Sequence, residues 1–168
     1  AAEPSRHAGE FVRKTAADFA SGDILLEPGM LLNPGALALA AMAGHGSLKV
    51  GGRPNIAIVS SGDELVPAGS ACTFAQIPSS NDPMLAAMLA TLPCEATQIG
   101  IIPDDLPQLE TALRSCAKYD IVVTSGGASV GDHDLVRQAL INIGAEIDFW
   151  KVSMKPGKPL MAGRIGKQ

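Results

Sequence analysis

The stretch 121–134 reads IVVTSGGASVGDHD, and it decides what kind of fold this chain adopts. Its first three residues form a short β-branched run, and residues 135–143, which follow it, carry apolar side chains at helical spacing. Between them lie glycines and hydroxyl side chains, which let a ligand approach the backbone closely. A strand that passes through such a loop into a helix directs free backbone N–H groups at negative charge. The stretch therefore predicts an anion-binding site at the end of a strand.

The composition indicates a globular domain with a sizeable core. Of the 168 residues, 46% are hydrophobic and 18% are charged, which argues against disorder. The net charge is −4 and the isoelectric point is about 5.3, so we expect neither nucleic acid nor an anionic membrane as the main partner. No apolar run approaches the roughly 18 residues that span a bilayer, and no secretory signal is predicted.

The three cysteines, Cys72, Cys94 and Cys116, are isolated in the sequence. None belongs to a C-x-x-C pair, and no histidine is close enough to complete a zinc set. A scattered, odd count suits a reducing compartment. We therefore expect three buried or half-buried thiols without a metal.

The rhythm of the chain changes after the sequence GGRP at residues 51–54, which indicates a linker. Residues 53–168 alternate β-rich runs with amphipathic segments, whereas residues 1–52 are short apolar pieces broken by glycine and proline. Alternating elements of these lengths predict an α/β domain with three layers: a mostly parallel sheet with helices on both faces. Residues 1–52 are predicted to form a smaller strand-and-helix segment.

Within this smaller segment, residues 24–26 and 30–32 flank a Glu-Pro-Gly turn signal and are predicted to be short strands. Pro34 suits the first position of a helix. We expect this helix to be buried, because residues 36–43 are apolar nearly all round.

In the α/β domain, strands are predicted at residues 55–60, 96–102, 121–124 and 147–152. Helices are predicted from Asn81 or Asp82 to about residue 92, from Asp104 or Asp105 through Cys116, and from Asp134 to residue 143. In folds of this kind, ligands bind beyond the carboxyl ends of the strands.

Polar side chains collect where the predicted strands end. Carboxylates follow three strands and lysines follow the fourth: Asp63, Glu64, Asp104, Asp105, Asp132 and Asp134, then Lys151, Lys155 and Lys158. Carboxylates on several loops suit a divalent cation such as Mg²⁺, and lysines neutralise phosphate or another oxyanion. Simpler interpretations exist: Asp104 and Asp134 as helix N-caps, Glu64 in a solvated turn, and the lysines beside a surface Pro-Gly turn. Their combination at one sheet edge favours a binding site.

The sequence contains neither a P-loop nor a strand followed by G-x-G-x-x-G. It resembles instead the molybdopterin molybdenumtransferase family, which is MoeA-like and includes the E domain of gephyrin. The segments that carry the resemblance are SGDEL at 61–65, Asn81, GIIPDD at 100–105, TSGG at 124–127 through Asp134, and KPGKP at 155–159. Residues 12–44 resemble the stretch before the family's molybdopterin-binding domain. The resemblance implies a fold similar to MoaB- and Mog-like molybdopterin-binding proteins.

The resemblance also implies a cytoplasmic role in molybdenum cofactor biosynthesis. Members insert molybdate into adenylylated molybdopterin and release AMP in a Mg²⁺-dependent step. The pathway's adenylyltransferase supplies their substrate, and the full-length form is implied to be a homodimer.

Matched by motif position, the family's catalytic residues fall on Asp18, Glu64, Asp104, Asp134, Lys151 and Lys155. For these residues we hypothesise that Glu64, Asp104 and Asp134 hold Mg²⁺ and orient a water or a molybdate oxygen, and that Lys151 and Lys155 stabilise oxyanions. The resemblance assigns molybdopterin binding to Ser61, Gly62, Asp63, Asn81, Ser125, Gly126, Gly127, Ser129, Gly131, Pro156, Gly157 and Lys158.

The chain departs from the family at Ala16 and Ser61, where members usually have Gly and Thr. Members also extend beyond both ends of this chain. We therefore expect residues 1–52 to be part of a linker and dimer region, and residues 53–168 to be an incomplete molybdopterin-binding domain. Two other functions stay open: a non-catalytic molybdopterin-binding or scaffold module, and the adenylyltransferase of the same pathway. Residues 22–54 favour the molybdenumtransferase over the adenylyltransferase.

Overall fold

The computed structural model describes residues 8–10, 12–126, 134–155 and 160–166. The chain forms two compact units, Ala1–Gly51 and Gly52–Gln168, so the division falls in the segment that the sequence marks as a linker. Within the described residues, no helix is both long enough and apolar enough to cross a membrane.

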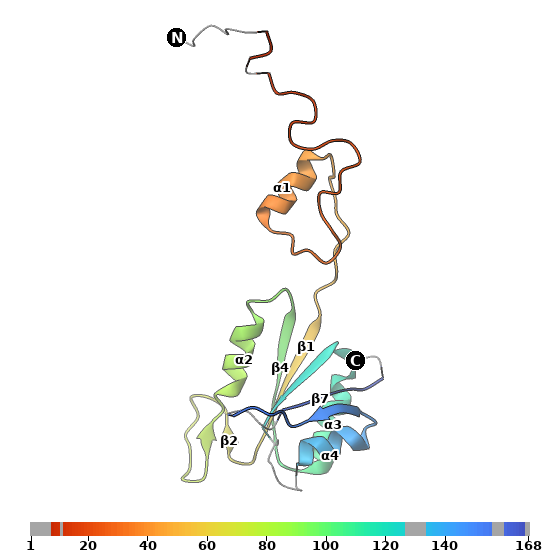
Figure 1. The fold of residues 1–168 in the computed structure, drawn as a ribbon. Coiled ribbons are helices and arrows are strands. Elements are labelled where there is room, and N and C mark those ends of the chain that lie inside the picture. Colours follow the sequence, from red (N-terminus) through yellow and green to blue (C-terminus); the bar gives the residue numbers. More distant parts are fainter. Residues whose placement is uncertain (1–7, 11, 127–133, 156–159, 167–168) are drawn as a thin grey trace. The chain divides into compact units, whose positions relative to one another are not determined.

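The described part of the first unit contains one helix, α1, at Pro34–Met42 (Figure 1). The proline occupies the first turn as predicted, and the Asn33 side chain caps the helix by accepting from the Ala36 N–H at 2.9 Å. Of the nine helical residues, Ala36 and Ala40 alone are buried within this structure. The prediction of a helix buried nearly all round is therefore wrong for the unit as described.

The same unit forms no strand at residues 24–26 or 30–32, where the sequence predicts two. Ile24 and Leu31 are 82% and 77% exposed, and no residue of either run is fully buried. The prediction is wrong because an apolar run becomes a strand only where a neighbour takes its backbone hydrogen bonds.

Three parallel strands form the central sheet of the second unit, in the order β4–β1–β5. They are β1 at Asn55–Ser61, β4 at Glu95–Ile102 and β5 at Ile121–Ser125, each within one residue of its predicted bounds. β1 is buried from Ile56 to its last residue, because it has a strand on each side and helices over the sheet. A continuous apolar run is typical of such a strand, which is why the sequence predicts it well.

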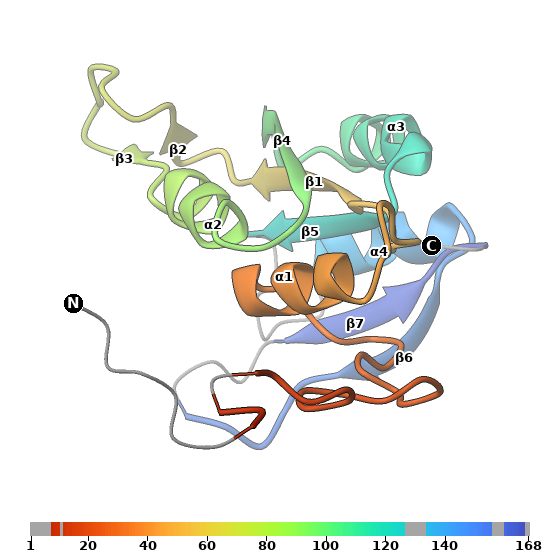
Figure 2. The same ribbon diagram turned by 90° about the horizontal axis from the view of Figure 1, so that it is seen from above.

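Helices cover both faces of this sheet, as Figures 1 and 2 show. α2 (Asn81–Leu89) lies on one side, and α3 (Leu106–Ser115) and α4 (Leu135–Asn142) lie on the other, with a short 3-10 helix, η1 (Cys116–Lys118), after α3. The core beneath α3 and α4 contains Leu109, Leu113, Val136 and Ala139, and a second cluster contains Ala57, Val59 and Cys116. These layers confirm the predicted α/β fold.

The helix starts distinguish capping aspartates from those with other roles. Asp105 and Asp134 each accept from a backbone N–H in the first turn, at 3.0 and 2.9 Å, and so cap α3 and α4. Neither Asn81 nor Asp82 is the N-cap of α2, since both lie inside its first turn. The prediction that one of them caps this helix is wrong, because both side chains bond to other elements.

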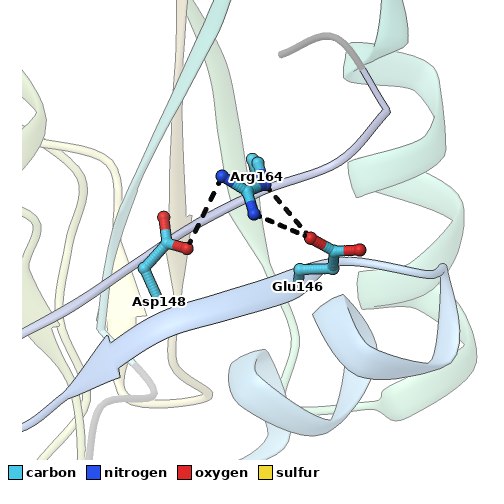
Figure 3. Close-up of polar contacts among 3 residues, drawn as sticks. All are labelled: Glu146, Asp148 and Arg164. Atoms are coloured by element: carbon cyan, nitrogen blue, oxygen red, sulfur yellow. Dashed lines mark hydrogen bonds and ion pairs between the residues drawn. The ribbon is translucent and has the colours of Figure 1, made fainter.

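The last two strands form a separate antiparallel hairpin, β6 at Glu146–Trp150 and β7 at Met161–Arg164. The sequence predicts a strand at 147–152 within the parallel sheet, so the strand is confirmed but its partner is not the expected one. β6 alternates polar and apolar residues, which suits a strand with one solvated face. Figure 3 shows that the Arg164 side chain joins the two strands by pairing with carboxylates of β6.

The cysteines occupy three different environments. Cys116 is buried, Cys94 is half-buried and Cys72 is exposed, so the prediction of at least partial burial is wrong for Cys72. Burial raises the pKa of the Cys116 thiol above its ordinary value of 9.0, and a neighbouring serine hydroxyl and lysine charge oppose this less strongly.

Candidate ligand-binding site

The order of the strands creates a crevice at the carboxyl ends of the sheet. The chain runs from β1 to β4 on one side and then crosses to β5 on the other, so the two crossovers cover opposite faces. Such a change of direction opens a crevice beyond the strand ends, where ligands of open α/β sheets bind. The site residues predicted at the ends of β1 and β5 lie at this crevice.

Two buried serines end β1 and connect it to both helix layers. Ser60 and Ser61 are 0% and 2% exposed, and neighbouring side chains of a strand point to opposite faces. Ser60 Oγ donates to the Asp82 carboxylate on α2, which also accepts from Ser79 Oγ at 3.0 Å. Ser61 Oγ donates to Asp104 Oδ1 at 2.6 Å. Because both acceptors are carboxylates, these bonds are charge-assisted and hold the end of β1 from both sides.

Three exposed carboxylates follow two neighbouring strands: Asp63 and Glu64 lie in the turn after β1, and Asp104 lies just after β4. Asp63 Oδ1 accepts from the Asp104 N–H at 3.0 Å, which links this turn to the end of β4. The Glu64 carboxylate folds back over Gly62, since a Cβ at Gly62 would lie 2.7 Å from Glu64 Oε2. Two short parallel strands, β2 (Leu65–Val66) and β3 (Ile77–Pro78), continue from the turn.

A hollow of about 650 Å³ adjoins this turn. Its walls include Gly62, Asp63, Ser79, Asp82 and Pro103. Small-molecule sites commonly enclose roughly 300–1,000 Å³. The hollow therefore has room for a ligand of cofactor size beside the carboxylates.

Gly126 fits the crevice because it has no side chain. Its φ is 93°, in the left-handed region, and a Cβ there would lie closer than 3.0 Å to the Ser61 carbonyl oxygen. Just before it, Ser125 Oγ accepts from Asn81 Nδ2 at 2.7 Å, which joins β5 to the first turn of α2. The ends of β1 and β5 and the start of α2 therefore converge.

Asp134 and Lys151 follow β5 and β6. Asp134 is 7% exposed; its Oδ1 caps α4, while its Oδ2 is buried and has no hydrogen-bond partner among the described residues. Lys151 is half-buried, with its Nζ 3.7 Å from the centre of the Trp150 ring. One oxygen of Asp134 therefore stabilises the start of α4, and the other is available to bind a cation or to accept a hydrogen bond.

Residues 57–168 match the family model described as "Probable molybdopterin binding domain". The chain belongs to this molybdopterin-binding domain family. Two relatives are both called molybdopterin molybdenumtransferase. That of Haemophilus influenzae is 35% identical over 155 residues, 92% of this chain and 38% of its own length. That of Nostoc sp. is 42% identical over 153 residues, 90% of this chain and 35% of its own length.

The solved structures give the same result. The molybdopterin biosynthesis MoeA protein from Pyrococcus horikosii has a TM-score of 0.75 and 29% identity, and the match covers 90% of this chain and 38% of that protein. The present molybdopterin-binding domain chain thus spans 35–38% of the length of the relatives named here.

Two further residues assigned through the family resemblance, Asp18 and Lys155, are exposed. Asp18 belongs to the first unit, where its Oδ1 pairs with Arg13 Nη2 at 2.9 Å on the exposed surface. Ala16 nearby has a φ of 59°, a conformation that favours glycine.

The three carboxylates predicted to hold a metal do not form a preassembled group. Across the described ranges, no three His, Cys, Asp or Glu side chains are placed to hold one ion. Mg²⁺ usually takes only one or two protein carboxylates and completes its shell with water and substrate phosphate. The unpartnered Asp134 Oδ2 and the exposed carboxylates after β1 and β4 fit that mode of binding.

The remaining predicted ligand-binding residues, Gly127, Ser129, Gly131, Pro156, Gly157 and Lys158, lie outside the described residues. The structure also reveals residues that the sequence does not assign to the site: Ser60, Ser79 and Asp82. The sequence does not assign Asp82 to the site because the Asn-Asp-Pro pattern is typical of a helix start. The sequence does not assign the two serines to the site because they belong to no recognisable motif.

Proposed function

We propose that this chain supplies the molybdopterin-binding part of a molybdopterin molybdenumtransferase. This enzyme would insert molybdate into adenylylated molybdopterin and release AMP. The proposal rests above all on the close approach of Gly126 to the Ser61 carbonyl oxygen, because a residue without a side chain at a strand end lets a phosphate reach backbone N–H groups. The names of the relatives support the same reaction.

The phosphate of the pterin would bind along the loop that starts at Ser125 and Gly126. Ser61, Gly62, Asp63 and Asn81 would line the neighbouring crevice, since they surround the ends of β1 and β5. The KPGK segment at 155–158 would add positive charge, and Lys151 and Lys155 would stabilise oxyanions on the substrate.

Mg²⁺ is proposed to bind Glu64, Asp104 and Asp134 together with substrate oxygens. When bound, it would neutralise phosphate charge and polarise the phosphoryl oxygens. Independently of the ion, Asp134 Oδ2 would orient a water or a molybdate oxygen, because this atom has no partner among the described residues. Asp18, which belongs to the first unit, would be a further catalytic residue.

The wider setting is part of the proposal. The substrate would come from the adenylyltransferase of the same pathway, the full-length protein would be a homodimer, and the reaction would take place in the cytoplasm. A reducing compartment suits a chain whose three cysteines are thiols.

The test is to titrate the purified chain with adenylylated molybdopterin, add molybdate and Mg²⁺, and measure AMP release. Asp134→Asn should abolish release, because the carboxylate charge is lost while asparagine still caps α4. Asp105→Asn is the matched control, since Asp105 caps α3 in the same way. Normal release by the Asp134 variant would refute the catalytic role.

A non-catalytic molybdopterin-binding module is the second candidate, supported by the description of the family model that matches residues 57–168. It predicts tight binding of molybdopterin without AMP release by the wild type. AMP transfer from ATP to free molybdopterin would instead identify an adenylyltransferase. Absence of any molybdopterin binding would refute all three functions.

A further inference from the structure

Trp150 contacts two cations from different elements. The guanidinium carbon of Arg137, on α4, lies 4.7 Å from the centre of the indole ring, and Lys151 Nζ lies 3.7 Å from it. Both distances are within the ~6 Å over which an aromatic face attracts a cation, and tryptophan is the strongest such partner. We call these three residues the Trp150 cluster. One ring therefore fixes two positive charges.

No ion pair neutralises the Trp150 cluster within the part of the chain that the structure describes. The ion pairs there join Arg13 to Asp18, and Arg164 to Glu146 and Asp148. Arg164 belongs to the same hairpin, and Figure 3 shows its guanidinium between two carboxylates. Among the described residues, Arg164 is thus neutralised by carboxylates of β6, whereas Arg137 of α4 and Lys151, which meet at the last residue of β6, have no carboxylate partner.

Two further observations favour ligand binding at the Trp150 cluster. Arg137 Nε is buried and has no hydrogen-bond partner among the described residues. Lys151 has a φ of 73°, which is uncommon for a residue with a side chain and is typical of functional sites. Its N–H donates to the Leu160 carbonyl oxygen at 2.8 Å, so the hairpin maintains this conformation.

We infer that Trp150 is a positioning residue that holds Arg137 and Lys151 as one binding seat for an oxyanion, either a phosphate group or a tetrahedral oxometallate. An aromatic face holds a cation without neutralising it, whereas a carboxylate would cancel its charge. The inference rests on and deepens the proposed function, because phosphate and molybdate belong to the proposed substrates. It assigns Arg137 as a direct anion ligand beside Lys151.

The test uses inorganic phosphate and, separately, molybdate as probes of the full chain, so it needs no turnover. Trp150 is the single tryptophan of the sequence, and its indole N–H gives one NMR signal that should shift saturably with either anion. Arg137→Gln should weaken phosphate binding about 5- to 10-fold. Arg164→Gln is the matched control, with the same change of charge on a neutralised arginine, and should leave the affinity unchanged.

Trp150→Leu and Trp150→Phe test the positioning role, with the Arg137 Nε–H signal as the reporter. We expect Leu to weaken binding as much as Arg137→Gln does, and Phe, which keeps an aromatic face, to recover part of the affinity. Backbone spectra establish folding, and Trp150→Phe carries the test if Trp150→Leu unfolds. Three results would each overturn the inference. Arg137→Gln could bind the anion as tightly as the wild type, Arg164→Gln could lose as much affinity as Arg137→Gln, or Trp150→Phe could lose as much affinity as Trp150→Leu.

The absence of a saturable shift in the wild type up to ~10 mM anion would also overturn it, since a Kd near 1 mM would be visible there. Anion binding without AMP release would leave the seat intact and refute the proposed enzyme. AMP release that is unchanged by Arg137→Gln and Trp150→Leu would support the proposed enzyme and refute the anion seat.

Discussion

Replacing Gly126 with alanine should destabilise the second unit because two separate penalties meet at this residue. A side chain at its φ of 93° costs about 1–2 kcal/mol in the left-handed region. The new Cβ would also lie closer than 3.0 Å to the Ser61 carbonyl oxygen, a backbone atom that cannot rotate away. Overpacking of this kind costs about 1–3 kcal/mol, so the sum is roughly 2–5 kcal/mol.

Gly144 provides a control that separates the two penalties. Its φ is 94°, almost the same as that of Gly126, but a Cβ there would meet nothing within 4 Å. Gly144→Ala should therefore lose only the conformational part, about 1–2 kcal/mol.

The assay is urea unfolding followed by the fluorescence of Trp150, the chain's single tryptophan, which reports on the second unit. The free energy of unfolding should fall further for Gly126→Ala than for Gly144→Ala, by about 1–3 kcal/mol. Equal losses in the two variants would show that the loop does not pack on the end of β1, and the argument for the crevice would fail with it.

The other predictions concern the carboxylates and the thiols. Asp134→Asn should change the free energy of unfolding by about 1 kcal/mol or less in a urea titration, since asparagine still caps α4; a much larger loss would mean that the buried Oδ2 is structural. Ser61→Ala and Asp104→Ala should show a coupling of about 1 kcal/mol in a double-mutant cycle, because each variant removes one partner of their hydrogen bond; strict additivity would contradict that bond. Cys72 should react with a thiol reagent at once and Cys116 only on unfolding; equal rates would contradict the burial. Burial raises the pKa of the Cys116 thiol above 9.0, so the contribution of this thiol to stability is complete below pH 9.0 and is lost as the pH rises through the folded-state pKa. The free energy of unfolding should therefore decline above pH 9.0 in a pH series, and it should decline less in Cys116→Ala.

The parallel sheet could be predicted closely because its strands are buried. The run at 56–59 is apolar throughout, which is typical of a strand buried on both faces. The pairing of β6 with β7 could not be predicted, since a local pattern indicates a strand but not its neighbour. β2 and β3 are two residues long each, too short to show any periodicity.

The candidate site was predictable to the extent that it follows strand ends. Ser61, Asp104 and Ser125 lie where their strands predict, because the carboxyl ends of parallel strands share one edge. Asp82 was not predictable as a partner of β1, since its local pattern equally suits a helix cap. The position of Asp18 relative to the sheet depends on how two units are arranged, which spacing within one unit does not determine.

The polar bonds at the strand ends join residues that are far apart along the chain. Asn81 and Ser125 are separated by 44 positions, and Ser61 and Asp104 by 43. The first bond requires the start of α2 to meet the end of β5, and the second requires the ends of β1 and β4 to meet. Loop closure makes such distant pairings slow to assemble. A ligand that bridges these ends would bind the completed sheet and not the unfolded chain. By mass action, its concentration would then raise the population of folded protein, so supply of the ligand and folding of the domain would be thermodynamically linked.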